Sequence, residues 1–147
     1  EHLDVVRDGM NLVVNGAGTA VRSKLQLENI TMAGKTGTAQ VRRIAGAQRG
    51  QSGAWKYRDH GLFVCFAPDA GPRYAAAVVI EHGMGGARAA APIAKDVLTF
   101  LYDRAQAMAS LEALEAGWGG NIEQRMAAKY ATFQGQPAAP PPLDPTI

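Results

Sequence analysis

The sequence predicts an α/β (α+β) fold in which helices flank an antiparallel sheet. Apolar side chains recur at helical spacing over residues 1–15 and again after Pro92. Between these helices, strand-like segments at 60–67 and 74–81 are separated by the turn-forming run Pro68-Asp69-Ala70-Gly71-Pro72, which favours a hairpin. With 147 residues, of which 47% are hydrophobic, the chain has enough apolar material for a core.

The first half of the chain alternates glycine-rich breaks with short elements. The helix over 1–15 ends at Asn15-Gly16-Ala17-Gly18, because glycine commonly follows the last helical residue. A short helical turn is expected within 19–26 and a strand over 30–41. The segment 42–58 is rich in glycine, glutamine and arginine, which predicts a long loop.

The second half predicts helices and a tail. The helix near Pro92 is expected to run to about residue 116, with Ile93, Val97 and Leu101 in the core. Gly117-Trp118-Gly119-Gly120 separates it from a further helix over 122–133. We assign residues 1–134 to one domain portion. Residues 135–147 contain five prolines and are expected to form a disordered tail.

Composition excludes several kinds of function. A formal charge of +2 predicts no affinity for nucleic acid by itself. Three histidines and one cysteine are too few and too scattered for a structural zinc site, so we predict neither a metal nor a cofactor. The single cysteine, Cys65, lies in an apolar run and is expected to be a buried thiol.

The sharpest local signal is the run Ala33-Gly34-Lys35-Thr36-Gly37-Thr38-Ala39-Gln40. A glycine inside a strand usually marks a place where a ligand or another backbone approaches closely, and Gly37 has this position. Thr36 and Thr38 are two residues apart, so their hydroxyls share one face of the strand. Together with the charge of Lys35, they suit a ligand that carries a carboxylate and pairs with a strand edge.

A phosphate-binding loop is the main competing interpretation of Gly34-Lys35-Thr36. That motif requires a glycine five positions before Gly34, where this sequence has Asn29, and a helix after the threonine. The residues that follow Thr36 are strand-like instead. The phosphate-loop interpretation therefore fails on the order of the residues.

A series of short matches along the chain extends this signal beyond one tripeptide. They are Gly9-Met10, Gly18-Thr19-Ala20, the run 33–40, Arg58-Asp59-His60 and Phe66-Ala67-Pro68. In this order they resemble the penicillin-binding transpeptidases, and most closely the cell-elongation branch of that family. The resemblance covers most of the chain and implies that it is the C-terminal portion of a transpeptidase domain with the penicillin-binding and serine β-lactamase fold.

The resemblance implies roles for the residues of the Lys-Thr-Gly run. Lys35 supplies positive charge near the reacting groups. The substrate is bound by Thr36, Gly37 and Thr38. The hydroxyls of the two threonines bind the substrate carboxylate, and the backbone N–H of Thr38 is one of the oxyanion-hole donors. The catalytic residues expected within this chain are thus Lys35 and Thr38. His60 is expected to have a structural role, capping or pairing with Asp59.

The nucleophile that the family uses is not found in the sequence. Its serine lies in a Ser-x-x-Lys box, and a second box reads Ser-x-Asn. Ser23, Ser52 and Ser110 are followed three residues later by Gln26, Trp55 and Ala113, so none fits the first box, and none fits the second. We therefore predict that this chain alone is inactive and that the remainder of the transpeptidase domain supplies the serine.

The resemblance also implies partners and a location for the parent protein. Its substrate is the peptidoglycan stem peptide, its inhibitors are β-lactam antibiotics, and its expected partner is a membrane glycosyltransferase of the elongation machinery. The expected location is the periplasmic face of the inner membrane, with the anchor outside this chain. Two alternatives stay open: a fragment of a serine β-lactamase or D,D-carboxypeptidase, and a non-catalytic sensor module on the same scaffold.

Overall fold

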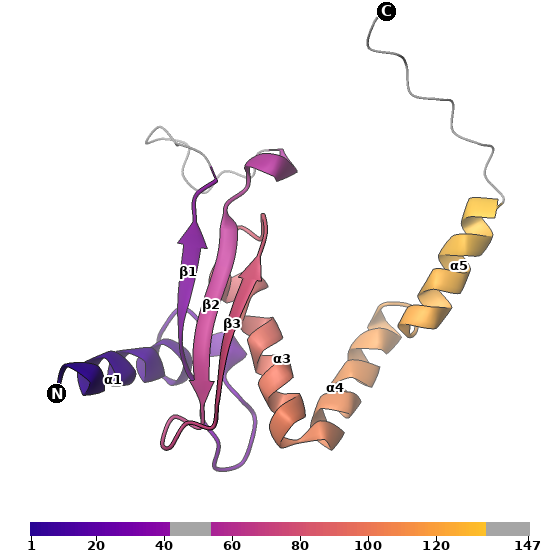
Figure 1. Cartoon of the computed structure of the whole chain (residues 1–147). Coiled ribbons are helices and arrows are strands. Elements are labelled where there is room, and N and C mark those ends of the chain that lie inside the picture. The colour runs from indigo at the N-terminus through magenta and orange to yellow at the C-terminus, as the bar shows by residue number, and fades with distance from the viewer. Residues whose placement is uncertain (42–53, 135–147) are drawn as a thin grey trace, which may run out of the picture. The chain divides into compact units, whose positions relative to one another are not determined.

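Three antiparallel strands form the centre of the fold in the computed structural model, which describes residues 1–41 and 54–134. The strands are β1 (Ala33–Ala39), β2 (His60–Ala67) and β3 (Tyr74–Ile80), in the order β1-β2-β3 (Figure 1). The predicted fold class and hairpin are confirmed, since β2 and β3 pair antiparallel. The first strand is shorter than the predicted 30–41.

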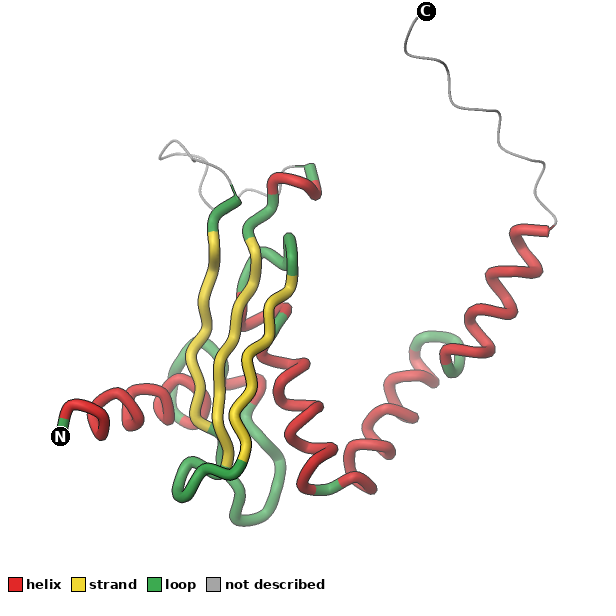
Figure 2. The backbone as a smooth tube through the Cα atoms, viewed as in Figure 1, coloured by secondary structure: helices red, strands yellow, loops and turns green. Residues whose placement is uncertain are grey.

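Helices and short turns accompany this sheet (Figure 2). They are α1 (His2–Asn15), the 3-10 turns η1 (Val21–Ser23) and η3 (Trp55–Tyr57), α2 (Gly86–Ala89) and α3 (Ala91–Tyr102). The prediction of one helix from Pro92 to about 116 is wrong, because α3 ends at Tyr102 and α4 (Arg104–Gly117) begins after Asp103. The Asp103 carboxylate accepts a hydrogen bond from the Gln106 N–H at 2.9 Å, and this cap starts a new helix.

One face of the sheet carries the core. The side chains of Phe63 and Cys65 on β2 are buried there together with Val14 of α1 and Leu98 of α3. On the opposite face, Val64 and Val79 are exposed. Within the described part of the chain, the helices therefore cover one face of the sheet.

The expectation that Ile93, Val97 and Leu101 form the core stripe of α3 is wrong. These three side chains are 42%, 49% and 48% exposed, whereas Ala91 and Ala94 are completely buried. The small alanines allow the helix axis to come close to the sheet, and Leu98 fills the remaining space. Both faces of α3 are apolar, so helical periodicity alone could not select the face that packs.

Glycines bring α2 into backbone contact with the strands. A Cβ atom on Gly86 would overlap the carbonyl oxygen of Leu62 and lie 2.8 Å from that of Gly37. A Cβ atom on Gly61 would lie 2.9 Å from the carbonyl carbon of Gly85. The start of α2 is therefore packed against the backbone of β1 and β2 at the position of Gly37.

The thiol of Cys65 is buried as predicted, with 4% of the residue exposed. Desolvation by burial raises its pKa to about 11, against a smaller opposing effect of a hydrogen bond with the backbone of Ala76. The thiol is therefore neutral at physiological pH and is not an activated nucleophile.

The described residues 108–134 belong to a second compact unit. Its helix α5 (Ile122–Gln134) starts with a reciprocal cap. The Asn121 side chain accepts a hydrogen bond from the Gln124 N–H at 2.9 Å, and the Gln124 side chain accepts one from the Asn121 N–H at 2.9 Å. The expected tail over 135–147 and most of the expected loop over 42–58 lie outside the described residues.

Candidate functional site

The Lys-Thr-Gly run occupies the strand at one edge of the sheet. Lys35, Thr36, Gly37 and Thr38 are consecutive on β1, which pairs with β2 on one side. Within residues 1–41 and 54–134, no strand pairs with its other side. Lys35 and Thr38 are exposed, and Thr36 and Gly37 are half-buried. The polar groups of the run are thus accessible along an open strand edge.

The strand register places the lysine and the threonines on opposite faces. Thr36 lies across from Phe63 and Thr38 across from Gly61, both on the face that carries the core. Lys35 lies across from Val64 on the exposed face. The Lys35 ammonium nevertheless donates a hydrogen bond to the carbonyl oxygen of Thr36 at 2.8 Å. Its side chain therefore folds back along the strand toward the threonines.

A residue outside the run joins it through its side chain. The hydroxyl oxygens of Thr19 and Thr36 are 2.8 Å apart, a hydrogen-bond distance, and either hydroxyl can donate. Sequence reasoning assigned no role to Thr19. The only available signal was that Gly18-Thr19-Ala20 is one of the short runs that carry the resemblance, and this says nothing about the direction in which the hydroxyl points.

The end of β1 is fixed by the segment around His60. The Nδ1 atom of His60 accepts a hydrogen bond from the backbone N–H of His82 at 2.9 Å. The backbone N–H of Met84 donates to the carbonyl oxygen of Asp59 at 2.9 Å, and the Asp59 carboxylate accepts a longer bond of 3.4 Å from the Val41 N–H. The ring of His60 thus bonds to the backbone of His82 and not to Asp59, the partner expected from the sequence.

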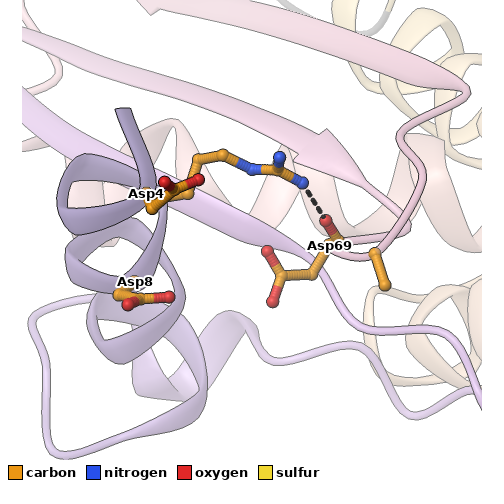
Figure 3. Close-up of a pocket in the computed structure, with 5 residues that line it drawn as sticks. Asp4, Asp8 and Asp69 are labelled. Carbon is orange, nitrogen blue, oxygen red and sulfur yellow. Dashed lines mark hydrogen bonds between the residues drawn. The ribbon is translucent and has the colours of Figure 1, made fainter. Parts of the chain in front are cut away.

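Two surface hollows among the described residues are lined by residues outside the run. One, of about 230 Å³, lies between α1 and the turn after β2, where Arg7 donates a hydrogen bond to the Asp69 carbonyl at 2.9 Å (Figure 3). Asn11 also donates to the carboxylate of Asp69, so these contacts fasten α1 to the hairpin. The other hollow, of about 350 Å³, is lined by Arg58, His82, Gly83, Met84 and Arg88.

The three serines lie in different parts of the chain. Ser23 is 1% exposed and belongs to the interior. Ser110 is on α4, and Ser52 lies outside the described residues. In the described ranges no three His, Cys, Asp or Glu side chains come together as metal ligands. None of the helices at 1–41 and 54–134 has the length and apolar character to cross a membrane.

Curated relatives are similar in sequence to part of this chain. The curated peptidoglycan D,D-transpeptidase MrdA of Acinetobacter baumannii is 42% identical over 98 residues, covering 65% of this chain and 14% of the relative. MrdA of Haemophilus influenzae is 32% identical over 99 residues, covering 66% and 15%. The chain thus spans about a seventh of the length of these relatives.

Two solved structures also match part of this chain. The complex between penicillin-binding protein 2 (PBP2) and MreC from Helicobacter pylori matches with a TM-score of 0.56 and 32% identity, over 71% of this chain and 18% of the other. Pseudomonas aeruginosa PBP2 in complex with WCK 5153 matches with a TM-score of 0.49 and 41% identity, over 65% and 18%.

The model of one protein family matches two thirds of the chain. Its description is the penicillin-binding protein transpeptidase domain, and it matches residues 1–99, which include all three strands and most of α3. The helices α4 and α5 follow the matched region. The resemblance inferred from the short motifs is thereby confirmed, and this chain belongs to the penicillin-binding transpeptidase family.

Proposed function

We propose that β1 forms the substrate-binding wall of a peptidoglycan D,D-transpeptidase that works through an acyl-serine intermediate. The observation that carries this proposal is the position of Lys35-Thr36-Gly37-Thr38 on an open strand edge. An extended peptide can add to such an edge through main-chain hydrogen bonds. The D-alanyl-D-alanine end of a stem peptide is a ligand of this kind and ends in a carboxylate.

The direction of the backbone groups along β1 supports this role. In an antiparallel strand, the N–H and C=O of one residue point to the same side, and this side alternates from residue to residue. The carbonyl of Thr36 accepts the Lys35 ammonium at 2.8 Å, which fits a carbonyl that points to the open edge. By alternation the N–H of Thr38 points to the same edge, where it can donate to a substrate.

The two threonine hydroxyls suit the substrate carboxylate. They lie on one face of the strand two residues apart, and the Thr38 residue is exposed. Hydrogen bonds to a charged group contribute roughly 1.5–3 kcal/mol each. The Lys35 ammonium, which lies next to the Thr36 carbonyl, adds a favourable positive charge.

The chemistry proposed for the parent protein requires groups that this sequence lacks. A serine, supplied by the remainder of the transpeptidase domain, gives its hydroxyl proton to a general base, and its oxygen attacks the carbonyl carbon of the D-alanyl-D-alanine bond. The Thr38 N–H stabilises the negative charge that develops on the carbonyl oxygen. The terminal D-alanine leaves as the amine, with a proton from a general acid. The amine of a second stem peptide then displaces the serine and forms the cross-link.

The same proposal extends to inhibitors, partners and location. A β-lactam would acylate the serine in place of the stem peptide, with its carboxylate on the threonines. We also propose the periplasmic face of the inner membrane as the location of the parent protein, and a glycosyltransferase of the elongation machinery as its partner. The sequence similarity to the MrdA proteins supports these last two points.

Labelling with a fluorescent penicillin tests the proposed function. The complete transpeptidase should show a covalent band that persists for hours, and a parallel sample of residues 1–147 alone should show none, because it lacks the Ser-x-x-Lys serine. A labelled band on the isolated chain would contradict the assignment of the nucleophile to another segment. Loss of the label from the complete protein within minutes would indicate a hydrolase instead.

A further inference from the structure

The hydroxyl of Thr19 lies close enough to the site to influence how the site binds its ligand. Thr19 and Thr36 are 17 residues apart in the sequence, and their hydroxyl oxygens are 2.8 Å apart. Thr19 belongs to the connection after α1, whereas Thr36 belongs to β1. A side chain from a second element therefore contacts one of the two hydroxyls that we assign to the substrate carboxylate.

The backbone on both sides of Thr19 holds it in this position. A Cβ atom on Gly18 would overlap the Cα atom of Val13, so the chain folds back over the last turn of α1 at a distance that only glycine allows. On the other side, the N–H of Ala20 donates to the Val13 carbonyl at 3.0 Å, and Ala20 is 1% exposed. The Thr19 hydroxyl is thus placed by a fixed turn.

The chemistry of the ligand determines which hydroxyl donates. A threonine hydroxyl has one hydrogen and two acceptor lone pairs, and an ionised carboxylate can only accept. When Thr36 donates its single hydrogen to a carboxylate, its bond with Thr19 requires Thr19 to be the donor. The two hydroxyls then form a chain that leads from Thr19 through Thr36 to the ligand, and such chains strengthen each bond.

We propose that Thr19 is a positioning residue that orients the Thr36 hydroxyl as a donor toward the substrate carboxylate. This inference rests on the proposed function of β1 and adds a residue to the site. Thr19 fixes the rotamer and hydrogen direction of Thr36 before the ligand binds, so that less freedom is lost on binding.

Acylation kinetics of the complete transpeptidase test the proposal. Thr19→Val keeps the shape of the side chain and removes the donor, so the second-order rate constant for acylation by fluorescent penicillin should fall about three- to tenfold, the range of one neutral hydrogen bond. Thr19→Ser keeps a hydroxyl and should restore the rate to within about twofold of the wild type. Because Thr19 is exposed, neither change should shift the thermal midpoint by more than about 2 °C.

A double-mutant cycle separates positioning from a general structural effect. If Thr19 acts through Thr36, then Thr19→Val should change the rate by less than about twofold in a Thr36→Val background. An equal loss in both backgrounds, or no loss in the wild-type background, would overturn the proposal. The proposed function of β1 is tested separately from the role of Thr19. It would be contradicted if the wild-type enzyme were not acylated, or if Lys35→Ala did not slow acylation, and neither result depends on Thr19.

Discussion

Replacement of Lys35 by alanine in the complete transpeptidase is expected to slow acylation by penicillin at least about a hundredfold, the lower end of what a positioned proton-transfer or charged group contributes. Lys35 is exposed, and its ammonium bonds to the Thr36 carbonyl rather than to an acidic group, so little folding energy depends on it. The rate should therefore fall without a comparable loss of stability. Stopped-flow labelling with a fluorescent penicillin measures the effect.

A matched control distinguishes a local role from a change in net charge. Lys24 is an exposed lysine of the same chain, just after η1, and Lys24→Ala removes the same charge. Its acylation rate should stay within about twofold of the wild type, as for surface substitutions in general. Lys35→Arg keeps the charge but changes the donor geometry, and it should recover only part of the rate. Equal rates for Lys35→Ala and Lys24→Ala would remove Lys35 from the site.

The second large effect is expected at Gly86, where α2 touches the strands. Alanine has a higher helix propensity than glycine, so without a clash Gly86→Ala would stabilise the helix by about 0.5–1 kcal/mol. The added Cβ atom would instead overlap the Leu62 carbonyl oxygen and approach that of Gly37 to 2.8 Å. We expect a net loss of about 3 kcal/mol in the free energy of unfolding, the upper end of the usual cost of overpacking.

The neighbouring glycine provides the control for this substitution. Gly85 has an extended backbone, and a Cβ atom there would have no atom within 4 Å. Gly85→Ala should therefore cost less than about 1 kcal/mol, the difference between glycine and alanine as a helix cap. Urea denaturation of the complete enzyme measures both variants. A Gly86→Ala midpoint equal to that of Gly85→Ala would show that α2 does not pack against the strands in this way.

Much of the fold was predictable from sequence because its signals are local. The hairpin of β2 and β3 follows from two apolar runs around a turn-forming segment, and α1 follows from periodicity and its terminal glycine. The face of α3 was not predictable, because Ala94 and Val97 are both apolar and only the close approach of the helix to the sheet selects the alanine. The break at Asp103 depends on a side-chain cap that competes with a continuous helix.

The part of the candidate site that lies on a single strand was predictable from the sequence. Lys35, Thr36 and Thr38 stand within four residues, and strand alternation alone separates the lysine from the threonines. Thr19 was not predictable, because its contact with Thr36 depends on how the chain turns back after α1. The nucleophile could not be identified in this sequence, because none of its serines occurs in a Ser-x-x-Lys or Ser-x-Asn motif.

The most direct test of the role of β1 is a crystal structure of the complete transpeptidase acylated by a penicillin. The ligand carboxylate should lie within hydrogen-bond distance, about 2.7–3.2 Å, of the Thr36 and Thr38 hydroxyls, and the acyl oxygen should accept the Thr38 N–H. A bound penicillin whose carboxylate is held by other residues, with the open edge of β1 out of contact, would contradict the account.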